Sequence, residues 1–242
     1  RGMRDCWDQN LIDLAYYNGG VYPRSVEIMD ELCKIYISSI DTADAMALLG
    51  GINGESYLIR CHGSRPSGLS FRALEPYLNN DPWSKELEGR NVLVISPFAE
   101  TIQAQYLKRR ELFKDPNVLP DFNLKVLKSE YAIAGMHANH ESWIAVLRAM
   151  QLRMDDIKYD VCLIGAGMFG MPLARHAKET GRKSVVIGGA LQNLFGIRGS
   201  RWEKFVTDVL AFYNDHWIRV GEAERKEGTS KIEGAVSYTH LT

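Results

Sequence analysis

Apolar positions along the chain follow two spacings, one typical of helices and one typical of strands. Residues 25–40 carry apolar side chains at helical spacing, and Ser25 stands where an N-cap would begin that helix. Residues 91–98, NVLVISPF, form a β-branched run that is typical of a buried strand. Residues 99–113 return to helical spacing, so this part of the chain predicts a strand followed by a helix.

The same alternation continues toward the C-terminus. Residues 122–131 alternate apolar and polar as a strand does, and residues 140–154 form an amphipathic helical pattern. Two further strands are predicted at 159–167 and 183–189, with a helix at 168–180 between them. Strands that alternate with helices predict an α/β fold: a doubly wound, mainly parallel, Rossmann-like sheet with helices on both faces and ligands at the carboxyl ends of its strands.

A glycine-rich turn interrupts the apolar pattern of residues 44–63, which we interpret as a buried strand, the turn and a second short apolar run. The turn, GGINGES, places Asn53 and Glu55 two residues apart beyond the strand. An amide oxygen and a carboxylate suit Mg²⁺ or Mn²⁺, with substrate phosphate and water completing the coordination shell. Because N-G-E is also a common surface turn, both interpretations stay open.

A second candidate site follows the strand at 91–98. Ser96, Pro97 and Phe98 end this strand and open the helix that contains Glu100 and Thr101. Two functions fit the pattern. Either Ser96 caps the helix, or the exposed amides of the first turn meet a phosphate.

Residues 160–170, DVCLIGAGMFG, contain Gly165, Gly167 and Gly170 at the G-x-G-x-x-G spacing of a dinucleotide-binding turn. An NAD site also needs an acidic residue about 20 residues further on, at the end of the next strand. No acidic residue lies between Glu179 and Glu203, which argues against NAD. The turn therefore predicts another phosphate-bearing ligand, unless its glycines serve packing alone.

The last predicted strand ends in a similar way. Gly188 and Gly189 offer a backbone that a ligand can approach closely, and Gln192 adds a neutral hydrogen-bonding group. Because the carboxyl ends of parallel strands meet at one edge of a sheet, we expect these three strand ends to converge there.

Composition narrows the class of protein. The 242 residues include 29 basic and 30 acidic side chains and are 45% hydrophobic, which predicts a globular protein without a nucleic-acid partner. The 4 cysteines are scattered, which argues against zinc and disulfides and favours a reducing cytoplasm. No run approaches the roughly 18 apolar residues of a membrane span.

We expect residues 1–235 to form a single domain. The last residues, 236–242, read VSYTHLT and resemble translated sequencing-adapter sequence. We expect them to be foreign to this domain and leave them out of the functional argument.

Four segments together resemble a known family: VLVISPFAETIQAQY, VLPDFNLKVLKS, YDVCLIGAGMFGMPLARHAKETGRKSVVIGGALQNLFGIRGSRW and YNDHWIR. From about residue 40 to residue 235, the chain is similar to bacterial glycosyltransferase-like proteins of the GT-D fold, which are often found in surface-polysaccharide gene clusters. The resemblance implies a cytoplasmic enzyme that transfers a sugar from a nucleotide-sugar donor to a glycan or lipid-linked acceptor. It also implies a divalent metal, Mn²⁺ or Mg²⁺, held on the diphosphate by an Asp-x-Glu motif.

That motif falls on Asn53, Gly54 and Glu55 in this sequence. The glutamate matches and the aspartate is Asn53, which removes one negative charge and weakens the attraction for a metal. Glu55 with a metal would serve the diphosphate, the backbone of residues 165–170 would help to hold it, and Glu100 is the best-placed general base. Two alternatives remain: a catalytically weakened relative that still binds the nucleotide, and an NAD-dependent oxidoreductase.

Overall fold

The computed structural model describes residues 7–48, 54–62, 67–130, 139–205 and 207–224. A four-stranded parallel sheet with the order β4-β3-β5-β6 forms its centre, and β1 and β2 form a separate two-stranded parallel sheet. The expected tail, residues 236–242, lies outside the described residues. The strands are β1 (Ala45–Leu48), β2 (Ser67–Ser70), β3 (Asn91–Ser96), β4 (Asn123–Lys128), β5 (Val161–Ile164) and β6 (Lys183–Val186).

Helices connect the strands of the central sheet, as the alternating pattern predicts. The α-helices are α1 (Gln9–Gly19), α2 (Val26–Thr42), α3 (Glu55–Cys61), α4 (Ala99–Leu107), α5 (Arg109–Leu112), α6 (Trp143–Asp155), α7 (Gly170–Glu179), α8 (Leu191–Leu194) and α9 (Ser200–Phe205). Short 3-10 helices span Phe71–Leu74, Pro76–Leu78, Trp83–Leu87, Gly167–Phe169, Gly188–Ala190, Thr207–Phe212 and Glu222–Glu224.

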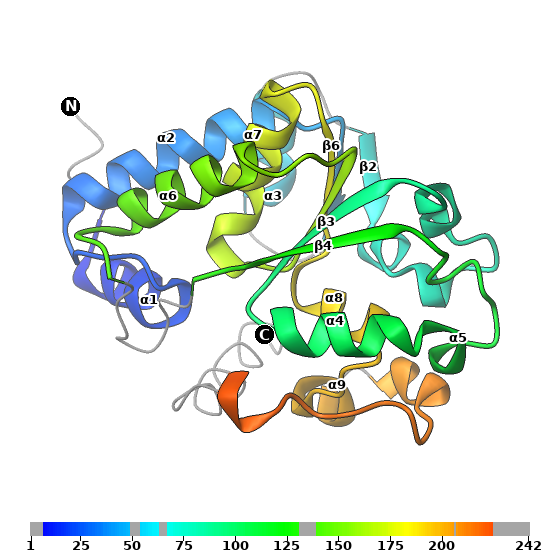
Figure 1. Cartoon of the computed structure of the whole chain (residues 1–242). Helices are drawn as coiled ribbons and strands as arrows, with labels where there is room; N and C mark the ends of the chain where they lie inside the picture. Colours follow the sequence, from blue (N-terminus) through cyan, green and yellow to red (C-terminus); the bar gives the residue numbers. More distant parts are fainter. Residues whose placement is uncertain (1–6, 49–53, 63–66, 131–138, 206, 225–242) are drawn as a thin grey trace.

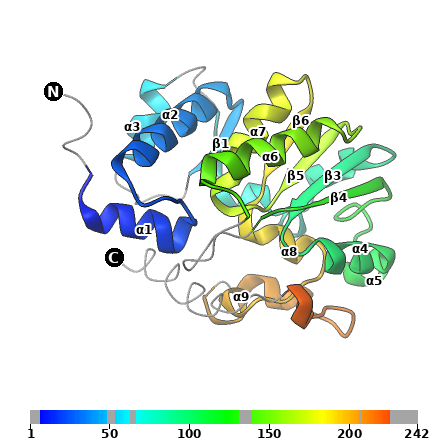
Figure 2. The same cartoon turned by 60° about the vertical axis from the view of Figure 1, so that its left-hand side comes forward.

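Helices cover both faces of the central sheet. Helices α1, α2, α6 and α7 lie on one face, and α4, α5, α8 and α9 lie on the other (Figures 1 and 2). Side chains of β3 alternate between two cores: Leu93 and Ile95 join the first, while Val92 and Val94 join the second. All four are fully buried. The expectation of an α/β fold with a parallel sheet and helices on both faces is thus confirmed, and the arrangement is compatible with a Rossmann-like fold.

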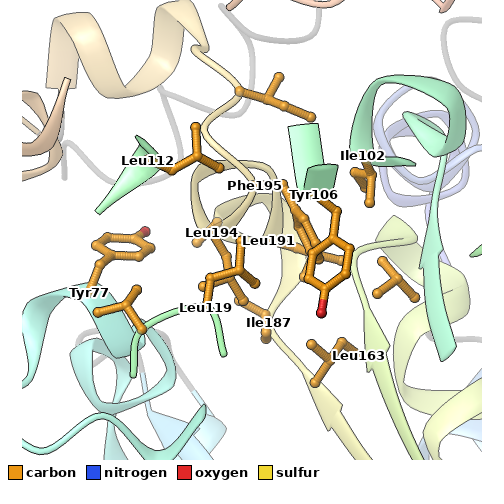
Figure 3. Packing of buried hydrophobic residues seen from close by; sticks show 14 of the residues in the cluster. Tyr77, Ile102, Tyr106, Leu112, Leu119, Leu163, Ile187, Leu191, Leu194 and Phe195 are labelled. Atoms are coloured by element: carbon orange, nitrogen blue, oxygen red, sulfur yellow. The ribbon is translucent and has the colours of Figure 1, made fainter. Parts of the chain in front are cut away.

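The second core fixes α4 against the sheet. Tyr106 of α4 lies beside Phe195, and both belong to the cluster that also holds Leu163 of β5 and Leu191 of α8 (Figure 3). The Tyr106 hydroxyl accepts a hydrogen bond of 2.6 Å from the backbone N–H of Phe122, just before β4. This contact ties the C-terminal end of the helix to the start of the next strand.

Helix capping follows the sequence at α2. The Ser25 hydroxyl accepts a hydrogen bond of 3.3 Å from the backbone N–H of Ile28, so the predicted N-cap is confirmed. Residues 99–113 differ from the prediction, because the helical run breaks at Lys108 into α4 and α5.

The expectation of a buried strand within residues 44–63 is wrong in one respect, because the strand forms but is not buried. In β1, Ala45 is exposed and the other three residues are only half-buried. The reason is its setting, because a two-stranded sheet leaves an edge of each strand open and gives less cover than the central sheet. The apolar run after the glycine turn forms helix α3, in which no residue is buried.

Candidate functional site

The turns that follow β3, β5 and β6 lie side by side at the carboxyl edge of the central sheet. The backbone N–H of Gly165 donates to the carbonyl oxygen of Ile95 at 2.9 Å, which joins the end of β5 to the end of β3. The N–H of Ile187 donates to the carbonyl of Ile164 at 3.0 Å, which joins the end of β6 to the end of β5. The predicted convergence of these strand ends is therefore present.

The direction of the chain reverses between β3 and β5. From β3 the chain passes through α4 to β4 on one side, and from β5 it passes through α7 to β6 on the other. Helices α4 and α7 cover opposite faces of the sheet. Open α/β sheets bind ligands at such a reversal, in the crevice outside the carboxyl ends of the strands. We therefore take the turns after β3 and β5 as the candidate site.

The three glycines after β5 differ in how much space surrounds them. A side chain at Gly165 would place its Cβ 2.7 Å from the carbonyl oxygen of Gly188, and one at Gly170 would lie 2.9 Å from Cγ1 of Val186. These two glycines allow close packing of the turn and of α7. Gly167 has a φ of +55° and nothing within 4 Å of its ideal Cβ, so its backbone faces open space.

The turn after β6 shows the same division. Gly188 has a φ of +68° and open space around its ideal Cβ, whereas a Cβ on Gly189 would lie 3.2 Å from the ring of Trp202. Gln192 donates from Nε2 to the carbonyl oxygen of Ile197 at 3.2 Å, so its side-chain amide holds its own turn together. Gly188 therefore resembles Gly167, while Gly189 and Gln192 serve local packing.

The expectation that Ser96 caps helix α4 is wrong. The helix begins at Ala99 with Phe98 as its N-cap, and no side chain at the cap position accepts a hydrogen bond. The Ser96 hydroxyl instead accepts from the backbone N–H of Phe98 at 3.2 Å, because the chain turns before the helix starts. The first-turn amides of α4 are thus left for another acceptor.

That acceptor is the carboxylate of Glu224. The backbone N–H of Glu100 donates to its Oε1 at 2.7 Å, and the N–H of Thr101 donates to its Oε2 at 3.1 Å. The Thr101 hydroxyl donates to the same Oε2. Glu224 is 6% exposed and lies in the last short helix before residue 225, drawn in orange-red near the start of α4 in Figure 1. The helix N-terminus after β3 therefore holds an anion, as its dipole and free amides favour.

Sequence reasoning missed Glu224 because it lies 124 positions from Glu100 and carries no local motif. It also missed Lys128 at the end of β4. Lys128 Nζ lies 3.0 Å from the side-chain carboxylate of Glu100, and both side chains are largely exposed. The candidate base therefore stands at the same edge of the sheet as the turns, with a cation beside it.

The predicted metal pair is described only in part. Glu55 is the first residue of α3 and is half-buried, whereas Asn53 lies outside the described residues. Within the described ranges, no group of three or more His, Cys, Asp or Glu side chains is arranged to hold a metal. Glu55 remains the one described residue of the Asp-x-Glu-like motif that carries a carboxylate.

A buried network of polar side chains, formed by Glu75, Tyr77 and Asn193, lies next to the turn after β6. The Tyr77 hydroxyl donates to Glu75 and accepts from Asn193 Nδ2 of α8 at 3.2 Å. All three residues are buried. Burial, followed by the negative charge of Glu75, raises the pKa of Tyr77, so its hydroxyl keeps its proton and stays a donor. The network anchors α8, which directly follows the Gly188 turn.

The described helices include none that is both long enough and apolar enough to cross a bilayer. No family model, curated protein or solved structure matches this chain.

Proposed function

We propose that this chain is a glycosyltransferase that moves a sugar from a nucleotide-sugar donor to a glycan or lipid-linked acceptor. One observation carries the proposal: the N-terminus of α4 holds an anion where the sheet reverses, at the same edge of the sheet as the open glycine backbones of Gly167 and Gly188. A diphosphate offers the charge and the acceptor oxygens that such a place selects. The resemblance to GT-D proteins is the basis for proposing that the diphosphate carries a sugar and that the reaction takes place in the cytoplasm.

The reaction would use these groups as follows. The bond between the anomeric carbon and the diphosphate oxygen breaks while the acceptor oxygen bonds to that carbon. The amides of α4 and the cation of Lys128 would stabilise the charge that develops on the leaving diphosphate. The carboxylate of Glu100 would take the proton of the acceptor hydroxyl. A divalent metal near Asn53 and Glu55 would supply further positive charge to the diphosphate.

A donor panel tests the proposal. The purified chain is incubated with Mn²⁺, an acceptor mixture and each nucleotide sugar in turn, and the release of nucleoside diphosphate is measured. We expect one class of donor to release nucleoside diphosphate, and we expect this release to require the acceptor. Absence of both release and nucleotide binding would overturn the proposal.

A catalytically weakened relative is the second candidate, and Asn53 is the observation that favours it. One carboxylate fewer at the motif reduces the attraction for the metal that the chemistry needs. This candidate predicts that nucleoside diphosphate binds to the chain while no donor is turned over. Calorimetric titration of nucleoside diphosphates beside the donor panel separates the two.

A further inference from the structure

Glu224 occupies the N-terminus of α4, where the proposed function puts a phosphate of the substrate. We propose that its carboxylate is a built-in competitor: it fills the anion seat of α4 in the free protein, and a phosphate of the substrate displaces it. The anion seat consists of the backbone N–H groups of Glu100 and Thr101 and the hydroxyl of Thr101. The proposal rests on the proposed function for the identity of the displacing substrate.

The carboxylate is held by a set of donors that a phosphate can also use. Both of its oxygens accept hydrogen bonds from α4, and Glu224 is buried almost completely. Among the described residues, no Lys, Arg or His forms an ion pair with it, and the nearby Lys128 pairs with the Glu100 side chain instead. A phosphate carries more charge and more acceptor oxygens than a carboxylate, so it gains more from the helix dipole and from Lys128.

The segment that carries Glu224 follows residues that are anchored to the core. The chain before it is fixed by Trp217, which is buried and donates from Nε1 to the carbonyl oxygen of Leu112 at 3.2 Å. Ile218 adds two backbone hydrogen bonds, to Gly196 and from Arg198. Glu224 follows as the last residue of the three-residue 3-10 helix Glu222–Glu224. Displacement therefore requires residues 222–224 to move relative to these anchors.

Competition of this kind weakens phosphate binding. The apparent affinity equals the affinity of the free seat multiplied by the fraction of time that the seat is free. If Glu224 fills the seat about nine-tenths of the time, its removal tightens phosphate binding about tenfold. The sign is opposite to that expected of an ordinary ligand-binding or structural residue, whose loss weakens binding.

The test compares Glu224→Gln with Glu179→Gln in the full chain, with inorganic pyrophosphate as the probe. Both variants remove one negative charge, but Glu179 pairs with Arg175 at 2.7 Å near the end of α7, before β6 begins. We expect calorimetry to give about tenfold tighter pyrophosphate binding for Glu224→Gln and wild-type affinity for Glu179→Gln. Equal or weaker binding by Glu224→Gln, or no binding by any of the three proteins, would overturn the proposal.

Hydrogen exchange on the wild-type protein tests displacement without a substitution. Pyrophosphate should reduce the protection of residues 222–224, because their segment leaves the seat, while the amides of Glu100 and Thr101 stay protected by the new ligand. Unchanged protection at 222–224 with pyrophosphate bound would show that Glu224 is a fixed structural cap and overturn the proposal.

The two proposals fail in different experiments. Pyrophosphate binding needs no sugar and no acceptor. If pyrophosphate displaces Glu224 but no donor is turned over, the transferase proposal fails, and Glu224 remains a competitor for another phosphate ligand. If a donor is turned over but Glu224→Gln binds pyrophosphate no more tightly than the wild type, the transferase proposal stands and the competitor proposal fails.

Discussion

At the scale of single residues, the turn after β5 assigns different roles to glycines that look alike in the sequence. Gly165 and Gly170 have no room for a Cβ, because a carbonyl oxygen or a valine methyl lies within 3 Å of the position it would take. Gly167 has room but a positive φ. The spacing of these glycines could be read from the sequence, but the space around each depends on β6 and α8, which no local pattern reveals.

Exchange of Gly167 for alanine should therefore affect the ligand more than the fold. The positive φ costs about 1–2 kcal/mol of stability, and the added methyl group stands where a phosphate would approach, so nucleoside diphosphate binding should weaken at least about tenfold. Gly181→Ala is the matched control, since Gly181 also has a positive φ and open space but lies before β6, at the other edge of the sheet. Denaturant unfolding and calorimetry measure both. Equal affinity in the two variants would remove the turn from the site.

Restoring the second carboxylate of the metal motif is a gain-of-function test at the same scale. Asn53→Asp should strengthen Mn²⁺ binding, because two carboxylates attract a hard divalent cation more than a carboxylate and an amide do. Titration of Mn²⁺ into both proteins measures the difference, which we expect to be about tenfold. Identical affinities would mean that the turn is a surface turn without a metal function.

At the scale of elements, the central sheet and the long helices could be predicted, and the short elements could not. The strand β3 and the helix α2 were readable because burial on both faces gives continuous apolar runs and an amphipathic helix repeats on one face. Helix α3 and the break at Lys108 were not, since short runs carry too few repeats to show a period. The contact between Glu224 and α4 joins segments that are 124 positions apart, so it depends on the finished fold.

The starts of β3 and β5 are joined by a charged hydrogen bond that makes their contact sensitive to pH. Asp160 Oδ2 accepts from the backbone N–H of Asn91 at 2.8 Å and from its side-chain amide at 3.0 Å, and these donors lower the pKa of Asp160. A carboxyl group with a lowered folded-state pKa stabilises the fold fully above its unfolded pKa of about 3.9, and this stabilisation is lost as the pH falls through the folded-state value.

Asp160→Asn should remove that part of the acid sensitivity. We expect the variant to be less stable than the wild type at pH 7. The difference should shrink as the pH falls below about 3.9, where Asp160 of the unfolded chain binds a proton, and should be lost below the lowered pKa of the folded state. Urea unfolding at pH 7, 5, 4 and 3 follows the difference between the two curves. A difference that stays constant over this range would contradict the assignment to the charged form of Asp160.

At the scale of the whole molecule, two cores share one sheet. Leu163 and Ile164 are neighbours on β5, both fully buried, and they point to opposite faces: Leu163 into the core with α4 and α8, Ile164 into the core with α6 and α7. The sequence predicts that both faces are covered, because the apolar run of β5 does not alternate with polar residues. It does not say which helices cover each face, since that depends on the direction in which every connection crosses the sheet.

A shared sheet predicts that the two cores melt together. Leu163→Ala and Ile164→Ala each leave a cavity in a different core, and each should cost about 2–5 kcal/mol. For a domain of this size 1 kcal/mol moves the melting temperature by roughly 2–4 °C, so each variant should melt about 4–20 °C lower than the wild type. Calorimetry should show one transition in all three proteins, because the strands that form the floor of one core are also the floor of the other. Two transitions, with each variant lowering only one of them, would mean that the halves fold independently and would contradict a single domain.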